Sequence, residues 1–113
     1  MKGVVNIVEI RECASAGTME SSDVYVEIEP GTEGISIQLE SVVLHQFGED
    51  IRRVVREVLD ECGVENADVR VVDRGALECV IRARVETAVL RAGLSAEDGG
   101  VAETAVLHGK GEV

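Results

Sequence analysis

The stretch of sequence that decides the fold is residues 24–40, VYVEIEPGTEGISIQLE. Apolar and polar residues alternate strictly over 24–29 and again over 35–40, which is the period of a strand with one buried face. The five residues between these runs, Pro-Gly-Thr-Glu-Gly, are typical of a turn. The pattern therefore predicts two strands that pair as a β-hairpin, with the valines, isoleucines and leucine on the buried face.

The sequence after this stretch changes to helical spacing. Over residues 41–62 the apolar residues recur every three or four positions, which predicts an amphipathic helix. Ser41 is the candidate N-cap, and Gly63 occupies the position at which a glycine commonly ends a helix. The apolar stripe consists of Leu44, Phe47, Ile51, Val54, Val58 and Cys62.

Four further segments complete the predicted architecture. Residues 4–12 and 67–73 read as strands, and the small, polar residues 14–23 read as a loop. Residues 76–92 predict a second amphipathic helix that includes Leu77 in its apolar stripe. Because two amphipathic helices need a sheet to cover, we expect an α+β fold: a two-layer sandwich with an antiparallel or mixed sheet of three or four strands and both helices on one face.

Length and composition limit the possible functions. The chain has 113 residues, and we expect one domain over residues 1–92 with a mobile C-terminal tail over residues 93–113. A net charge of −11 and an aromatic content of 2% argue against binding to nucleic acid or to an anionic membrane surface. No apolar run is long enough for a transmembrane span, and no signal peptide is visible, so we expect a cytoplasmic protein. Its acidity favours docking onto basic partner proteins.

The residues that usually carry catalysis form no recognisable motif. Cys13, Cys62 and Cys79 include no Cys-x-x-Cys pair, so a structural zinc site is not expected. We interpret the three cysteines as free thiols, with Cys62 and Cys79 as small buried side chains in the helices. His45, expected as an exposed residue at the start of the first helix, and His108 in the tail are not brought together by any motif.

Two segments remain as candidate sites. Residues 20–23, Glu-Ser-Ser-Asp, place two hydroxyls between two acids just before a predicted strand, where a serine would be accessible to a modifying enzyme. Serine and aspartate are also common in turns, so a purely structural loop is the alternative. Residues 74–91 carry four arginines against two glutamates, and Arg82 and Arg84 are among them. Arginine is suited to recognising phosphate and carboxylate groups, and an intramolecular ion-pair network is the alternative.

These two segments give the sequence a family resemblance. Residues 16–24, AGTMESSDV, resemble the N-terminal signature of the acyl carrier protein, or gamma chain, of citrate lyase. Residues 73–85, DRGALECVIRARV, are similar to the second signature of that family, and residues 46–48 and Ile51 also match. The resemblance covers about two thirds of the chain, roughly residues 16–92. Two separated motifs in the same order and spacing make it specific.

The resemblance implies a carrier that is not itself a catalyst. Family members hold a prosthetic group through a phosphodiester on the serine that follows the glutamate of the Ala-Gly-Thr-x-Glu-Ser motif, which is Ser21 here. The implied group is 2'-(5''-triphosphoribosyl)-3'-dephospho-CoA, covalently attached as a phosphoribosyl-dephospho-coenzyme A arm whose thiol carries acetyl and citryl thioesters. The implied partners are the alpha subunit, which exchanges acetyl for citrate, the beta subunit, which cleaves the citryl thioester to oxaloacetate, and the prosthetic-group transferase.

The resemblance also sets expectations for neighbouring residues and leaves alternatives open. A swinging arm needs an exposed attachment point on a mobile loop, which Gly17 and its small neighbours are expected to provide. Arg82 and Arg84 are expected to contact the phosphates of the arm or a partner subunit. The alternatives are the acyl carrier subunit of malonate decarboxylase, which uses the same prosthetic group, a protein-interaction module with a structural serine loop, and a thiol enzyme that uses Cys13 or Cys79. The arginine-rich second signature favours citrate lyase.

Overall fold

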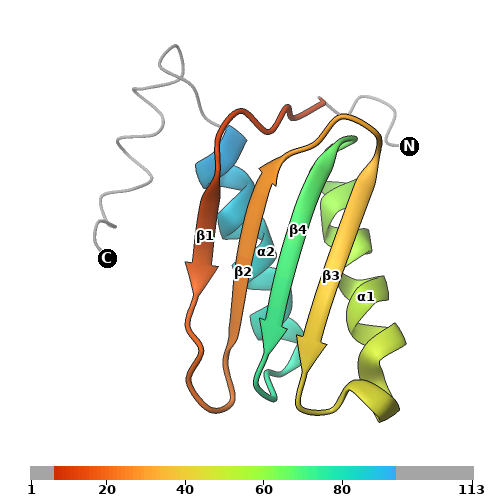
Figure 1. Cartoon of the computed structure of the whole chain (residues 1–113). Helices are drawn as coiled ribbons and strands as arrows, with labels where there is room; N and C mark the ends of the chain where they lie inside the picture. Colours follow the sequence, from red (N-terminus) through yellow and green to blue (C-terminus); the bar gives the residue numbers. More distant parts are fainter. Residues whose placement is uncertain (1–6, 94–113) are drawn as a thin grey trace.

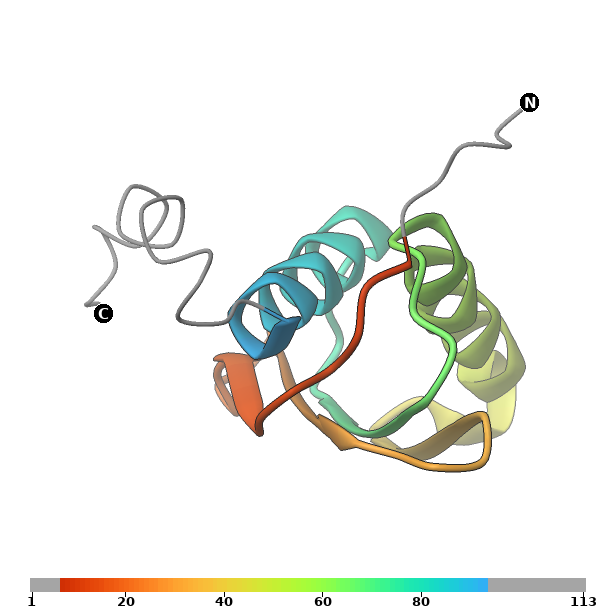
Figure 2. The same ribbon diagram turned by 90° about the horizontal axis from the view of Figure 1, so that it is seen from above.

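The computed structural model describes residues 7–93 as a two-layer α+β fold. A four-stranded mixed sheet forms one layer, and both helices pack on one of its faces (Figures 1 and 2). The fold class predicted from the sequence is therefore confirmed. In chain order the elements are β1 (Ala14–Gly17), β2 (Val24–Pro30), β3 (Ile35–Ser41), α1 (Leu44–Glu61), β4 (Ala67–Asp73) and α2 (Glu78–Gly93). Within the described part of the chain, no helix is long and apolar enough to cross a membrane.

The predicted β-hairpin is wrong, although both of its strands exist. The strands lie in the order β1-β2-β4-β3, so β4 is inserted between β2 and β3. It runs antiparallel to β2 and parallel to β3. The β2–β3 connection crosses the start of β4, where a Cβ atom on Gly31 would come within 2.9 Å of the Ala67 nitrogen. The central position suits β4 because five of its seven residues are buried, whereas the inward residues of β3 are only partly buried.

The edge strand β1 was missed, because residues 14–17 were predicted to belong to a loop. Its four residues pair antiparallel with β2, from Ala14 opposite Ile28 to Gly17 opposite Tyr25. The strand predicted over residues 4–12 is not found in the described part of that segment. There, Val8 makes an isolated bridge, and residues 4–6 lie outside the described residues. Apart from Gly93, which belongs to α2, the predicted tail also lies outside them.

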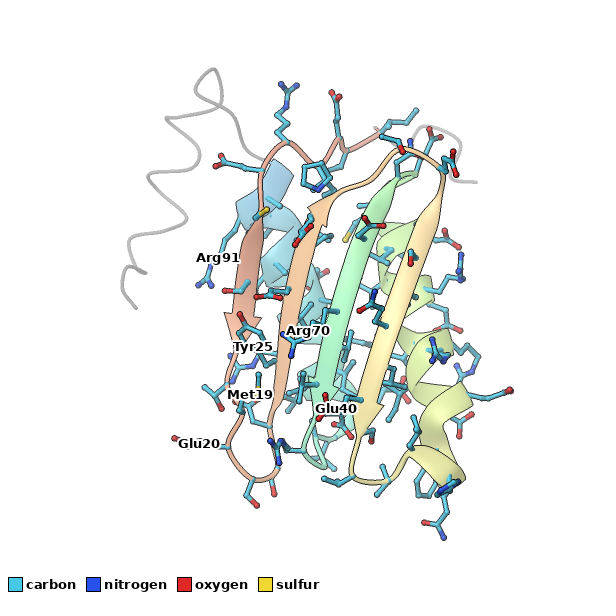
Figure 3. The ribbon with its side chains drawn as sticks, viewed as in Figure 1. Met19, Glu20, Tyr25, Glu40, Arg70 and Arg91 are labelled. Carbon is cyan, nitrogen blue, oxygen red and sulfur yellow. The ribbon has the colours of Figure 1, made fainter. Side chains whose placement is uncertain are left out.

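The core between the sheet and the helices is aliphatic, as the composition requires. The inward side chains of β2, Val24, Val26 and Ile28, are fully buried, which confirms the orientation predicted from alternation. The opposite face of the sheet is uncovered, and Figure 3 shows Tyr25 and Arg70 there. The two helices and the sheet therefore enclose a single hydrophobic cluster, and the polar outward residues of the strands face solvent.

The start of α1 differs from the prediction. The helix begins at Leu44 after an N-cap at Val43 that makes no side-chain capping bond, so Ser41 is not the cap. Leu44 and Phe47, assigned to the apolar stripe, are 43% and 49% exposed. The end of the helix is as predicted, because Gly63 has a φ of +82° and follows the C-cap directly.

Candidate functional site

Ser21 lies in the connection between β1 and β2, residues 18–23, which we call the serine turn. The Asp23 N–H donates to the Glu20 carbonyl at 3.1 Å, so Glu20 to Asp23 form a β-turn with the two serines at its centre. Ser22, at the third position, has a φ of +67°, whereas Ser21 does not have a positive φ. This combination is that of a type II turn. The serine turn projects from the sheet edge, as the position of Glu20 in Figure 3 shows.

The two neighbouring serines differ in how firmly they are held. The Ser22 N–H donates to the Arg74 carbonyl at 2.8 Å, and the Arg74 N–H donates to the Asp23 carbonyl at 2.8 Å. These two bonds fasten the second half of the serine turn to the β4–α2 connection. Ser21 is exposed, and its hydroxyl makes no hydrogen bond within the described residues. Ser21 does not have a positive φ, whereas Ser22 lies in the left-handed region.

The Asp23 carboxylate organises the base of the serine turn. It accepts hydrogen bonds from the Thr18 hydroxyl at 2.7 Å and from the Val24 N–H at 2.7 Å. The Arg84 guanidinium donates to both carboxylate oxygens, from Nε at 3.2 Å and from Nη2 at 3.0 Å. Thr18 Oγ1 also accepts the Glu20 N–H at 3.1 Å. The residues before and after the serines are thereby joined to each other and to α2.

The surroundings of Asp23 keep this carboxylate ionised. Desolvation by burial raises its pKa, but the hydrogen bonds from Thr18, Val24 and Arg84 and the positive charge of Arg84 outweigh it, so the pKa is lowered from 3.8. Asp23 is therefore a permanent anion at neutral pH. Its arrangement is that of a structural ion pair and not of a general base.

Gly17 has a different role from the one expected. It belongs to β1 and has a φ of +93°. A Cβ atom there would lie 1.9 Å from the Val24 carbonyl oxygen and 3.2 Å from Arg84 Cδ. Glycine is thus required because the backbone of β2 and the stem of Arg84 approach it closely, which corrects the interpretation of Gly17 as a flexible flank.

Asp73 is a site residue whose role sequence reasoning missed, because it was interpreted as the last residue of a strand and as part of the motif over residues 73–85, with no role for its side chain. Its side chain is 1% exposed and accepts the Ser41 hydroxyl at 2.8 Å and the Ala76 N–H at 3.0 Å. Asp73 therefore ties together the ends of β3 and β4 and the approach to α2. Arg74, which holds the serine turn, is its neighbour in the chain. An acid at the end of a predicted strand, directly before Arg-Gly, is the sequence signal that could have revealed it.

Comparison with known proteins decides the family. A family profile described as "ACP: Malonate decarboxylase delta subunit (MdcD)" matches residues 11–92. The citrate lyase acyl carrier protein of Escherichia fergusonii is 59% identical over 85 residues, which cover 74% of this chain and 88% of the relative. The citrate lyase acyl carrier protein of Halothermothrix orenii is 44% identical over 90 residues, which cover 80% of this chain and 96% of the relative. The chain belongs to the citrate lyase acyl carrier protein family.

A solved structure has the same fold as this acyl carrier protein. One chain in the crystal structure of a Pseudomonas malonate decarboxylase hetero-tetramer in complex with malonate superposes with a TM-score of 0.67. The two chains are 26% identical, and the match covers 79% of this chain and 92% of the other. Together with the names of the curated relatives, membership in this family makes the protein a non-catalytic carrier component, as predicted.

The two candidate arginines of the carrier protein are not brought together. Arg84 reaches the serine turn, whereas Arg82 contacts Glu57 at 2.6 Å, Glu61 at 3.6 Å and Glu78 at 3.2 Å. The hydrogen bonds that Arg82 donates to Glu78 and Glu57 raise its pKa against the opposing effect of desolvation. Both side chains thus form intramolecular ion pairs, as the structural alternative predicted. Contact with the phosphates of an arm or with a partner stays a prediction for both.

The cysteines offer no catalytic arrangement in the described part of the carrier. Cys13 and Cys79 are exposed, so the prediction that Cys79 is buried is wrong: it lies on the solvent side of the first turn of α2. Cys62 is partly buried, and burial together with Glu86 and Glu61 raises the pKa of its thiol, which lowers the thiolate fraction. His45 is exposed, as predicted, and His108 lies outside the described residues. Residues 7–93 contain no group of three or more His, Cys, Asp or Glu that could hold a metal ion.

Proposed function

We propose that Ser21 of this citrate lyase acyl carrier protein is the covalent attachment site of 2'-(5''-triphosphoribosyl)-3'-dephospho-CoA. The exposed Ser21 hydroxyl, at the centre of a held turn and at the motif position, carries this proposal. Attachment forms a phosphodiester to Ser21 Oγ, releases pyrophosphate and passes the hydroxyl proton to a base outside this chain. When bound, the group would supply a terminal thiol that holds acetyl and citryl groups as thioesters during the cleavage of citrate to oxaloacetate and acetate.

The residues present fit such a group. Its attachment needs one accessible hydroxyl and space around it, and Ser21 supplies both because it is exposed and its hydroxyl makes no hydrogen bond within the described residues. Ser22 is less suited, because its backbone lies in the left-handed region and is tied to Arg74. Nothing in the arrangement requires this chain to supply an acid or a base. The chemistry therefore belongs to the partner enzymes.

The distribution of exposed apolar residues supports docking through the end that bears the serine turn. Among residues 7–93, seven large apolar side chains are exposed, and five of them lie at this end, where the β1–β2, β3–α1 and β4–α2 connections meet (Figure 1). They are Met19, Val42, Leu44, Phe47 and Leu77. On a chain of net charge −11, such a patch fits larger partners with basic rims. We propose the alpha and beta subunits of citrate lyase and the prosthetic-group transferase, in the cytoplasm, as these partners.

Intact-mass spectrometry of the full chain, incubated with the transferase and the coenzyme-derived donor, tests the attachment site. We expect one added prosthetic group on the wild-type protein and on Ser22→Ala, and none on Ser21→Ala. Equal loading of Ser21→Ala would overturn the assignment to Ser21. If the wild-type protein takes up no group at all, the protein-interaction module becomes the better interpretation.

A second candidate function is the acyl carrier subunit of malonate decarboxylase. The matching family profile and the superposed structure both name that enzyme, which favours it as the alternative. The loaded carrier can be added either to citrate lyase alpha and beta subunits with citrate or to carrier-free malonate decarboxylase with malonate. We expect oxaloacetate from the first mixture. Carbon dioxide from the second mixture and no oxaloacetate from the first would reverse the assignment.

A further inference from the structure

We propose that Arg84 is a positioning residue, which acts through Asp23 to hold the serine turn in the one geometry that presents Ser21 to the transferase. This inference rests on the proposed function, because it concerns the same serine. It differs from the expectation that Arg84 binds the phosphates of the arm. The two roles can be separated by substituting Asp23: transfer should become slower if Arg84 positions the turn through Asp23, and should be unchanged if Arg84 binds the arm directly.

The contacts of the ion pair favour the positioning role. Both oxygens of the Asp23 carboxylate accept a nitrogen of Arg84, and each accepts one further donor from the turn or from β2. The four acceptor positions of a carboxylate are then filled. The Nε and one terminal nitrogen of Arg84 are engaged in the fork geometry that fixes a carboxylate in orientation. Two nitrogens of Arg84 are therefore already bonded to the Asp23 carboxylate.

The connectivity of the turn explains why this pair matters for Ser21. Before the serines, Thr18 bonds to Asp23, and after them Asp23 itself leads into β2. Arg84 is the one α2 side chain that is hydrogen-bonded to the serine turn within the described residues. The other tether is the backbone of Arg74, which precedes α2. Removing Arg84 would leave the turn attached to the body of the protein through Arg74 and its own two strands.

The packing of the Arg84 side chain against Gly17 also supports the positioning role. Its Cδ atom lies 3.2 Å from the position that a Cβ atom on Gly17 would occupy. The stem of Arg84 therefore passes over the last residue of β1 and reaches Asp23 only because residue 17 has no side chain. A turn held by both its flanks and by a helix implies that movement of the acyl group comes from the flexible arm, while the polypeptide around Ser21 keeps its shape.

The test measures the kinetics of prosthetic-group transfer, with the full-length carrier and the donor each varied in turn while the other is held at a fixed high concentration. We expect Arg84→Gln and Asp23→Asn each to lower kcat/KM by roughly tenfold or more, since misplacing a reacting group by about 1 Å can cost about a hundredfold. The loss should fall mainly on kcat, with the KM for the donor unchanged. The double variant should be no slower than the single variants, and Arg84→Lys should restore part of the rate. Peptide mapping should show some modification of Ser22 in the loosened variants.

A matched control lies on the same helix. Arg91 also ties α2 to the sheet edge, by donating to the Ser15 carbonyl at 2.8 Å, but it contacts β1 and not the serine turn (Figure 3). Arg91→Gln should therefore be modified at the wild-type rate. Circular dichroism and thermal unfolding of every variant show whether it is folded at the assay temperature. Thr18→Val, which leaves the ion pair in place, provides a second and milder loosening of the turn.

Two results would overturn the proposal. If Arg84→Gln raises the donor KM while Asp23→Asn leaves transfer unchanged, Arg84 binds the donor directly. If Arg84→Gln is modified as fast as Arg91→Gln, the ion pair has no role in presenting Ser21. Failure of the proposed function has a separate signature, because the wild-type protein would then take up no prosthetic group.

Discussion

Replacing Gly17 by alanine tests whether the close packing beneath the serine turn is as tight as described. Two effects add in this variant. An L-residue at a φ of +93° pays about 1–2 kcal/mol for the left-handed backbone. The new Cβ atom would also lie 1.9 Å from the Val24 carbonyl oxygen, which is a backbone atom that must shift.

The second effect can be sized from the bond that this shift disturbs. The Val24 carbonyl accepts the Thr18 N–H at 3.2 Å. Losing such a bond costs about 0.5–1.5 kcal/mol, so Gly17→Ala should lower the free energy of unfolding by about 1.5–3.5 kcal/mol in total. A domain of this size loses about 4–8 °C in Tm per kcal/mol, which corresponds to a fall of at least about 6 °C.

Urea and thermal unfolding followed by circular dichroism measure this loss, and Gly34→Ala is the matched control. Gly34 has a φ of +89°, but a Cβ atom there would meet nothing within 4 Å. The control therefore carries the backbone cost without the clash. If Gly17→Ala is no less stable than Gly34→Ala, within about 0.5 kcal/mol, the steric reasoning is refuted.

Three further predictions concern charged groups and thiols. Asp73→Ala should lower the free energy of unfolding in urea by about 1–3 kcal/mol because it leaves two partly buried donors, the Ser41 hydroxyl and the Ala76 N–H, without their acceptor. Asp68→Ala, on the exposed face of β4, should change it by less than about 0.5 kcal/mol. Asp23→Asn should have a lower free energy of unfolding than the wild type at about pH 6, and this difference should be smaller at about pH 3. The reason is that the pKa of Asp23 is lower in the folded than in the unfolded protein, so its ionised carboxylate stabilises the fold above the unfolded pKa near 3.8, and this stabilisation is lost as the pH falls through the folded pKa. Iodoacetamide should alkylate Cys62 more slowly than the exposed Cys13, since burial raises the pKa of the Cys62 thiol.

Each of these predictions has a contrary result. Equal losses for the two aspartate-to-alanine variants of β4 would show that burial of Asp73 does not matter. A stability gap for Asp23→Asn that is the same at both pH values would show that the carboxylate has an ordinary pKa in the folded state. Equal alkylation rates, measured by mass spectrometry of the peptides, would show that Cys62 is as accessible as Cys13.

The strands and helices that bury one face could be predicted, because burial imposes a period on the sequence. Alternation located β2 and β3 and assigned their inward residues, and helical spacing located α1 and α2. The short edge strand β1 could not be found in this way. Its sequence, Ala-Ser-Ala-Gly, has no period, and it is a strand because β2 offers it a free edge and only Ala16 is fully inside. Leu44 and Phe47 kept the helical period but lie at the exposed start of α1.

The sequence by itself determined the fold class, the position of the candidate serine and the acidity of the carrier, since these depend on periodicity, a local motif and composition. Only the tertiary structure decided that β4 lies between β2 and β3, because alternation reports which face of a strand is buried and not which strand is its neighbour. Only the tertiary structure also brought Asp23 to Arg84, 61 residues away, and Asp73 to Ser41, 32 residues away. Such contacts depend on how whole strands and helices pack, which no local stretch of sequence specifies.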